Sequence, residues 1–327
     1  MRRVLKDNGG VALILTVLII SIIVAVTLEF NTAMRSELYA AVNLRDGIRL
    51  GCVARSGFDY ALAVLFEDAL DAERPFDSLR EPWADSKALS DNSSSLFEEA
   101  AFEVQIRDLA GRIQINALVN QKGEYNALQK DLLTRLLTLE PFALEAEEVD
   151  NLVDAIKDWM DKDEEVTKFG AESAYYQTLE KPYLCRNAPL ESLEELLLVR
   201  GMTRELFYGT GEKPGISRFL TIYGDGKVNI NTADPVVLRS LSANLDQRGV
   251  EDMVSYREDE YNDISQPNWY KSVPGMSIEV AMDDLVTTTS HHFEIISEAF
   301  QDSMRKRVQG LVERKEGKIK IVSWKVE

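Results

Sequence analysis

The stretch of this chain whose residue types best suit chemistry is an acidic run at 158–165, with the sequence DWMDKDEE. Five carboxylates fall within these eight residues, at the expected end of a helix. The macrodipole at a helix C-terminus favours cations, so bunched carboxylates there must be solvated or neutralised. Asp-x-Asp followed later by a Glu is a pattern by which Ca²⁺ collects six to eight oxygen ligands. The candidate calcium ligands are Asp158, Asp161, Asp163 and Glu172.

A solvated acidic loop is the alternative interpretation of this run, because charge runs usually form solvated surfaces. The run is not an EF-hand loop, since its Gly and its final Glu do not stand at the required places. The residues alone leave both interpretations open.

The N-terminus holds a second distinctive pattern. Basic residues precede Gly9-Gly10, and an uncharged run follows from Val11 to Leu28. As a helix, this run is roughly 27 Å long, close to the ~30 Å hydrocarbon core of a bilayer. A secretory signal peptide, a plain anchor helix and a processed leader are the three interpretations. No A-x-A-like cleavage site follows the apolar run, which argues against the signal peptide.

A short basic leader that ends in Gly directly before an apolar helix resembles the leader of type IV pilins and pseudopilins. The resemblance implies cleavage by a prepilin peptidase between Gly10 and Val11, with methylation of the new amine. Most members of that superfamily carry Glu as the fifth mature residue, where this chain has Leu15. A carboxylate in lipid is costly unless it is paired. A chain without this Glu resembles the K-type minor pseudopilin, which is placed at a filament tip.

Composition excludes several functions. The 327 residues carry a net charge of −18, with 55 acidic and 37 basic residues, and such a chain is a poor nucleic-acid binder. The basic leader predicts that the body lies on the side of the membrane opposite the cytoplasm; in a bacterium this side is the periplasm.

His291 and His292 are adjacent in an expected strand and point to opposite faces, so they form no metal pair. Without a Gly-x-Ser-x-Gly or His-Glu-x-x-His motif, we expect no enzyme.

Two cysteines, Cys52 and Cys185, can pair in an oxidising compartment, but two cysteines do not make a disulfide framework. Their pairing stays open.

The stretch 228–257 resembles a helix-hairpin-helix module that binds the DNA backbone. It lacks the Gly-x-Gly hairpin, and the body is acidic, so we interpret it as a packing unit.

The elements that must position these residues follow from periodicity. Apolar residues at helical spacing predict one long helix from Val11 to about Leu70, and 76–100 is expected to be a polar surface loop. Alternation over 102–107 and again over 113–115 predicts a β-hairpin, and 124–225 shows helical patterns. Three strands from Phe293 to the end predict an antiparallel meander that needs a helix on one face. The fold class is therefore α+β.

Taken together, the chain resembles the type II secretion system minor pseudopilin K family. The matching residues, beyond the leader and Leu15, are the stretches 111–116, 158–163, 170–172, 182–183, 187–190, 194–196, 201–202 and 228–233. The resemblance implies a pseudopilin fold, a long N-terminal transmembrane helix packed on an antiparallel sheet, with a large inserted all-α domain. The implied divisions are a leader over 1–10, a transmembrane part over 11–28, a pseudopilin domain over 29–120 and 285–327, and an inserted helical domain over 121–284.

The family also implies a role at the tip of the type II secretion pseudopilus, in the inner membrane. There the chain joins the I- and J-type minor pseudopilins and other pseudopilins, initiates pseudopilus assembly for export of folded proteins from the periplasm, and binds calcium. A minor pilin of a type IV pilus or DNA-uptake machine is the alternative. A membrane-anchored periplasmic hydrolase is a third hypothesis, for which the sequence offers no catalytic motif.

Overall fold

The computed structural model describes residues 8–71, 74–91, 93–97, 99–315 and 317–327. The basic residues of the expected leader fall within 1–7 and lie outside this part of the chain. The first helix is α1, Asn8–Asp68. The remaining elements are, in chain order, η1 Pro82–Ala84, α2 Ser86–Ser90, α3 Ser93–Leu96, β1 Ala101–Asp108, β2 Ile113–Gln114, η2 Ile115–Leu118, α4 Ala127–Thr138, α5 Ala146–Met160, α6 Ser173–Tyr176, η3 Leu193–Leu198, α7 Arg204–Tyr208, η4 Ile216–Arg218, β3 Leu220–Thr221, β4 Val228–Asn229, α8 Pro235–Leu241, α9 Gln247–Glu258, η5 Trp269–Ser272, β5 Val286–Thr287, β6 His292–Gln301, β7 Met304–Lys315 and β8 Lys318–Val326.

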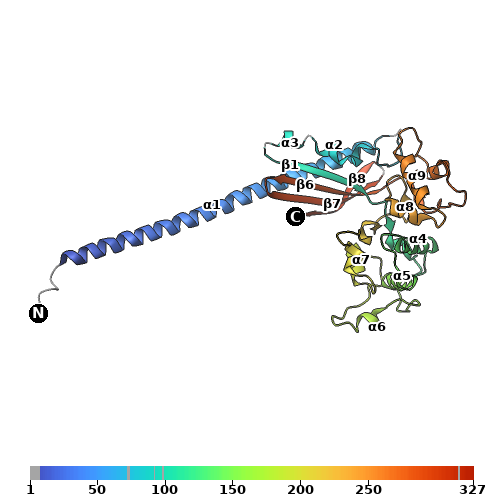
Figure 1. Ribbon diagram of the computed structural model, residues 1–327, viewed down its shortest axis with the longest axis horizontal. Helices are drawn as coiled ribbons and strands as arrows, with labels where there is room; N and C mark the ends of the chain where they lie inside the picture. Colours follow the sequence, from blue (N-terminus) through green and yellow to red (C-terminus); the bar gives the residue numbers. More distant parts are fainter. Residues whose placement is uncertain (1–7, 72–73, 92, 98, 316) are drawn as a thin grey trace.

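Helix α1 has two halves with different surroundings. Its N-terminal half extends away from the body and exposes its apolar side chains, while its C-terminal half lies on the sheet (Figure 1). Among the described residues, α1 is the only helix long and apolar enough to cross a membrane. This confirms the predicted long helix, which ends at Asp68 rather than at about Leu70.

The main sheet has four antiparallel strands in the order β1-β6-β7-β8. Strands β6, β7 and β8 form the predicted meander, with a register shift between Leu311 and Val312. Apolar side chains alternate along β1 and β6 and face α1, since neighbouring residues of a strand point to opposite faces. The core between helix and sheet contains Leu50, Phe58, Val104, Phe293 and Val308, among others.

Close approach of α1 to the sheet depends on a glycine. A Cβ on Gly57 would lie 2.9 Å from the ring of Phe102 and would collide with the hydroxyl of Ser297. Gly57 stands in the middle of a helix, where glycine weakens helical stability by roughly 1 kcal/mol relative to alanine. The cost is offset because the missing side chain lets the helix pack directly on β1 and β6.

The predicted hairpin over 102–115 is wrong. Strand β1 pairs with β6, and the short strand β2 pairs in parallel with β3, so that Ile113 lies opposite Leu220. The chain turns out of the sheet after β1, where the amide of Arg112 donates to the carbonyl of Leu109 at 3.2 Å. Alternation identified both strands but carries no information about their partners.

The stretch 76–100 also differs from the expected irregular loop. It forms η1, α2 and α3, which cover the edge and one end of the sheet. Asp85 caps α2 by accepting hydrogen bonds from the amides of Lys87 and Ala88, each at 3.0 Å. Trp83 is buried against Phe293, with ring centroids 5.3 Å apart.

A second core lies at the end of the sheet away from the N-terminus (Figure 1). It is built mainly from α4, α5, α8, α9 and the loops between them, and it also takes in Ile113, Ile115 and Val286. Helix α5 contributes a continuous apolar stripe that includes Val149, Val153 and Ile156. Both cysteines are free thiols, Cys52 exposed on α1 and Cys185 buried in this second core.

Candidate metal centre

The acidic run lies where α5 ends and the chain turns back toward α6. Asp158 occupies the last turn of α5, Asp161 is its C-cap residue, and Glu172 is the N-cap residue of α6. The loop between them folds over the end of α5, because the amide of Thr167 donates to both carboxylate oxygens of Asp158 at 3.1 Å. The structure therefore brings together residues that stand fourteen positions apart.

Three of the four predicted ligands converge. One carboxylate oxygen from each of Asp158, Asp161 and Glu172 lies within 4.8 Å of the others, and all three residues are buried, with at most 1% of their surface exposed. Asp163 does not join them. It lies on the surface, where its side chain accepts a hydrogen bond from the amide of Glu165 at 2.8 Å.

Several oxygens of the cluster have no donor. Within the described part of the chain, Asp161 Oδ1 and both carboxylate oxygens of Glu172 accept no hydrogen bond from nitrogen or oxygen donors. Buried carboxylates are normally paired or bound to a metal, because an isolated buried charge costs several kcal/mol. Asp161 and Glu172 thus have carboxylate oxygens without such a donor, in a cluster where one oxygen from each of the three residues lies within 4.8 Å of the others. This arrangement fits a hard cation with oxygen ligands.

The charges of the cluster support the same conclusion. Burial raises the pKa of Glu172 to about 8, and the neighbouring carboxylates of Asp158 and Asp161 push it in the same direction. Burial likewise raises the pKa of Asp158 and of Asp161. Lys157 forms an ion pair with Asp161 and donates to the Thr167 hydroxyl at 2.8 Å. When all three carboxyl groups are ionised, one lysine leaves two negative charges, which a divalent cation would balance.

Gly170 and Asn187 hold the loop in place; they fall within the matching stretches 170–172 and 187–190, but the sequence did not predict this role. Gly170 is required because a Cβ there would collide with the Asp158 carboxylate. Asn187 donates from its side chain to the Asp163 carbonyl at 2.9 Å and to Glu164 at 3.0 Å. The four-residue spacing of Lys157 and Asp161 was a further signal in the sequence, because ion pairs along a helix have this spacing.

The predicted processing residues lie elsewhere. Gly10 and Val11 stand near the start of α1, where Gly10 has open space around it and Val11 is 59% exposed. His292, the histidine that begins β6, stacks on Tyr223 with ring centroids 5.5 Å apart. Among the described residues, neither histidine belongs to a cluster suited to a metal.

The fold is shared with a solved structure described as the GspK-GspI-GspJ complex from the enterotoxigenic Escherichia coli type 2 secretion system. The match has a TM-score of 0.68 and 16% identity, and it covers 87% of this chain and 98% of the other. This defines the fold class: an α+β protein with a long N-terminal helix on an antiparallel sheet.

The sequence comparisons are more specific. The family model "Type II secretion system (T2SS), protein K" matches residues 111–209. The type II secretion system protein K of Aeromonas hydrophila is 29% identical over 262 residues, covering 76% of this chain and 74% of the relative. That of Klebsiella pneumoniae is 24% identical over 231 residues, covering 69% and 67%. The chain is therefore similar to type II secretion system protein K, the family that its sequence resembles.

Proposed function

We propose that this chain is the minor pseudopilin at the tip of a type II secretion pseudopilus. There it forms a complex with the I- and J-type minor pseudopilins and initiates assembly of the other pseudopilins, for export of folded proteins from the periplasm. The observation that carries the proposal is the protein K match over 111–209 in a chain whose fold follows a solved GspK over 87% of its length.

The shape of the molecule supports a tip position. The second core is attached at the end of the sheet away from the N-terminus, so it lies beyond the part of α1 that packs on the sheet (Figure 1). A subunit with such a bulky end leaves little room for another subunit above it. Leu15 on α1 is 51% exposed and offers no carboxylate to the amine of a neighbouring chain.

We further propose that α1 anchors the chain in the inner membrane as a single span, with the globular part in the periplasm. A prepilin peptidase would cut between Gly10 and Val11, and the new amine would be methylated. Intact mass and N-terminal sequencing of the chain from membranes that contain the peptidase test this step. A chain that starts at Val11 with one added methyl group supports it, and a chain that retains residues 1–10 contradicts it.

Calcium is the ion that we propose for the metal centre. Asp158, Asp161 and Glu172 would hold it, and the ion would supply charge neutralisation rather than catalysis. By joining the end of α5 to the start of α6, the bound ion would fix the loop 161–172 in place. The buried oxygens of Asp161 and Glu172 that have no nitrogen or oxygen donor support this assignment.

The proposed role is structural, and the protein K family is a component of a secretion machine. We propose no catalytic activity and no nucleic-acid partner. The alternative function, a minor pilin of a type IV pilus or DNA-uptake machine, shares the anchor helix and the processing step. The matched relatives are secretion proteins, which favours the secretion role.

A strain that lacks the chain separates the two functions. The secretion role predicts that exported proteins accumulate in the periplasm of this strain, while pilus-dependent motility and DNA uptake continue. Complementation with the intact chain should restore export. If export continues while motility or DNA uptake stops, the secretion role is contradicted and the pilus alternative is favoured.

A further inference from the structure

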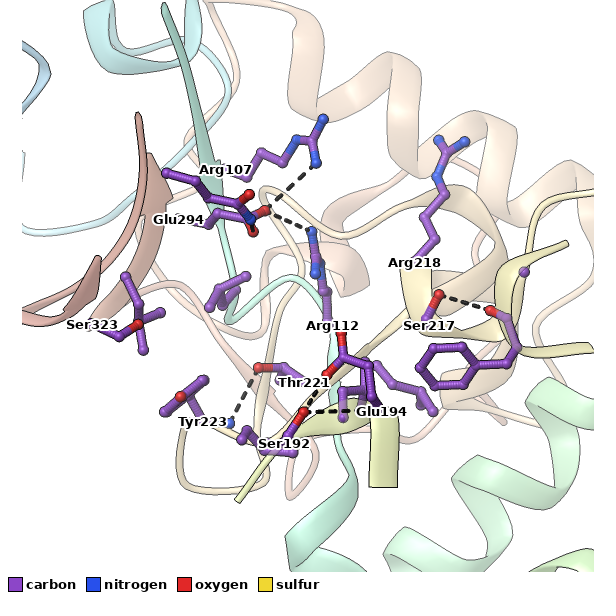
Figure 2. A pocket seen from close by; sticks show the side chains of 18 of the residues that line it. Arg107, Arg112, Ser192, Glu194, Ser217, Arg218, Thr221, Tyr223, Glu294 and Ser323 are labelled. Atoms are coloured by element: carbon purple, nitrogen blue, oxygen red, sulfur yellow. Dashed lines mark hydrogen bonds and ion pairs between the residues drawn. The ribbon is translucent and has the colours of Figure 1, made fainter. Parts of the chain in front are cut away.

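A hollow of about 840 Å³ lies where the main sheet joins the second core (Figure 2). Arg107 and Arg112, which line it, lie 3.5 Å and 3.8 Å from the Glu294 carboxylate (Figure 2). Arg218 pairs with Asp234 at 3.0 Å. Each of these arginines has a carboxylate beside it, so the hollow does not require an ion. The metal centre is different, because its carboxylates outnumber the basic group that pairs with them.

Lys157 is the basic residue that forms an ion pair with the metal centre, within the described part of the chain. It stands in the last turn of α5, four residues before Asp161. Its ammonium group pairs with Asp161 Oδ2 and donates to the Thr167 hydroxyl at 2.8 Å. Only 13% of the Lys157 side chain is exposed, and the Asp161 side chain is fully buried. Helical ion pairs at this spacing usually lie on the surface and contribute little, whereas this one is shielded from water.

The Asp161 carboxylate has different surroundings at its two oxygens. Oδ2 accepts the ammonium group of Lys157, while Oδ1 is buried and has no donor among the described residues. One Asp161 oxygen lies within 4.8 Å of an oxygen of Asp158 and of one of Glu172. A carboxylate can bind Ca²⁺ through one oxygen or through both. While Lys157 holds Oδ2, Asp161 has one oxygen left for an ion.

The charge of Lys157 acts on the same ion. An ammonium group repels a divalent cation on the carboxylate beside it, and the repulsion is stronger out of water than in it. The same group is favourable when calcium is scarce, because buried carboxylates without a counter-charge destabilise a fold. Lys157 therefore has two opposite effects: it stabilises the calcium-free chain, and it weakens calcium binding.

We propose that Lys157 is a built-in counter-cation that sets the calcium affinity of the metal centre. It neutralises part of the cluster when calcium is scarce, and it makes a bound ion easier to release. This inference rests on the proposed function, of which the calcium site is a part, and it names the residue that regulates that site. The chain thus folds without calcium and takes up the ion where calcium is abundant.

The test is a calcium titration of the full-length chain in detergent by isothermal titration calorimetry. It is carried out at pH 8.5, above the pKa of about 8 to which burial raises Glu172. Lys157→Met removes the charge and keeps a long side chain, so it should tighten calcium binding about tenfold or more. Lys157→Arg keeps the charge, so its calcium affinity should stay within about threefold of that of the unchanged chain.

The matched control is Lys162→Met. Lys162 is an exposed residue of the same acidic run and lies outside the cluster. This substitution changes the net charge by the same amount as Lys157→Met, so it measures the long-range electrostatic effect alone. It should change the calcium affinity less than about twofold, because solvent and salt screen exposed charges.

Thermal unfolding supplies a second readout, which a purely structural ion pair would not move in the same way. In a chelator, Lys157→Met should lower the melting temperature by about 5 °C or more, because the buried Asp161 carboxylate loses its partner. In saturating calcium most of this deficit should disappear, since the ion replaces the lost charge. A deficit of equal size with and without calcium indicates an ordinary structural pair and overturns the inference.

The titration also separates the inference from the calcium site itself. If the unchanged chain binds calcium and Lys157→Met binds it equally well or more weakly, the inference fails while the calcium site stands. If neither chain binds calcium, the calcium site and the inference both fail. The tip function is unaffected by that result, because it rests on the fold and on the similarity to protein K.

Discussion

At the scale of single residues, the metal centre is defined by what burial does to three carboxylates. Asp158, Asp161 and Glu172 gather at the C-terminus of α5, where the helix macrodipole disfavours negative charge. The oxygens of Asp161 and Glu172 that lack a nitrogen or oxygen donor make the arrangement unfavourable unless a cation compensates it. The proposed calcium ion thus has a direct consequence for stability.

Calcium should raise the melting temperature of the chain, and Glu172→Gln should abolish that rise. An ion at 100 times its dissociation constant stabilises the folded state by about 2.7 kcal/mol. Differential scanning fluorimetry with calcium and with a chelator measures the effect. Asp163→Asn is the matched control, because Asp163 lies on the surface outside the cluster, and this variant should keep most of the rise. Equal melting temperatures with and without calcium in the unchanged chain would argue against the site.

A different buried carboxyl, Glu81, should make stability depend on pH. Burial raises its pKa to about 7, although its carboxylate accepts hydrogen bonds from the Ser78 amide and the Trp83 indole, each at 2.8 Å. The folded state therefore holds this proton more tightly than the unfolded state does. Its contribution is fully present below pH ~4.5 and is lost as pH rises through about 7.

The variant Glu81→Gln should lack this dependence, because a glutamine oxygen can accept the same two hydrogen bonds without titrating. Relative to the unchanged chain, its free energy of unfolding should increase between pH 5 and pH 8. Urea unfolding at both pH values, in constant saturating calcium, measures the difference. A difference that is the same at both pH values would contradict the assignment to Glu81.

The candidate site was only partly predictable from these residues. The density of carboxylates and the later Glu172 identified the centre, because residue type and rough spacing are visible in a sequence. The exclusion of Asp163 was not visible, since it depends on the turn made when Thr167 donates to Asp158.

At the scale of elements, the packing of α1 on the sheet determines how firmly the helix is attached to the rest of the chain. Gly57 permits that contact, while Gly51 on the same helix has open space where a Cβ would stand. The two positions thus differ in packing and share the same helical backbone. Their alanine variants form a matched pair.

The variant Gly57→Ala should destabilise the chain by about 1–3 kcal/mol, because the added methyl group overpacks the contact with Phe102 and Ser297. The variant Gly51→Ala should stabilise it by roughly 0.5–1 kcal/mol through helix propensity. Urea unfolding of the full chain in detergent measures both. Similar effects of the two substitutions would show that close packing at Gly57 is unimportant.

The elements show where sequence patterns succeed and fail. Period-two alternation correctly located β6, which buries one face, while turn residues marked where β7 and β8 begin. β8 itself is exposed along almost its whole length. The same alternation at Ile113 suggested a hairpin, but β2 lies in the second core and pairs with β3, more than one hundred residues later. Strand pairing over such a distance depends on how the whole core packs, which local periodicity does not report.

At the scale of the whole molecule, a buried polar network connects the sheet to the second core. The Asn229 side chain donates to the Ser290 hydroxyl at 2.8 Å and to the Asp77 carbonyl at 3.1 Å. Arg314 on β7 forms ion pairs with Asp68, the last residue of α1, and with Asp77 in the segment that follows α1. These contacts join α1, the sheet and the second core.

The central claim, that this chain forms the tip complex with two other minor pseudopilins, is tested most directly by native mass spectrometry. The full-length chain and the I- and J-type minor pseudopilins of the same organism would be purified together in detergent with calcium. A tip subunit should form a ternary complex that contains all three chains. A chain that remains alone, or that associates only with further copies of itself, would contradict this function.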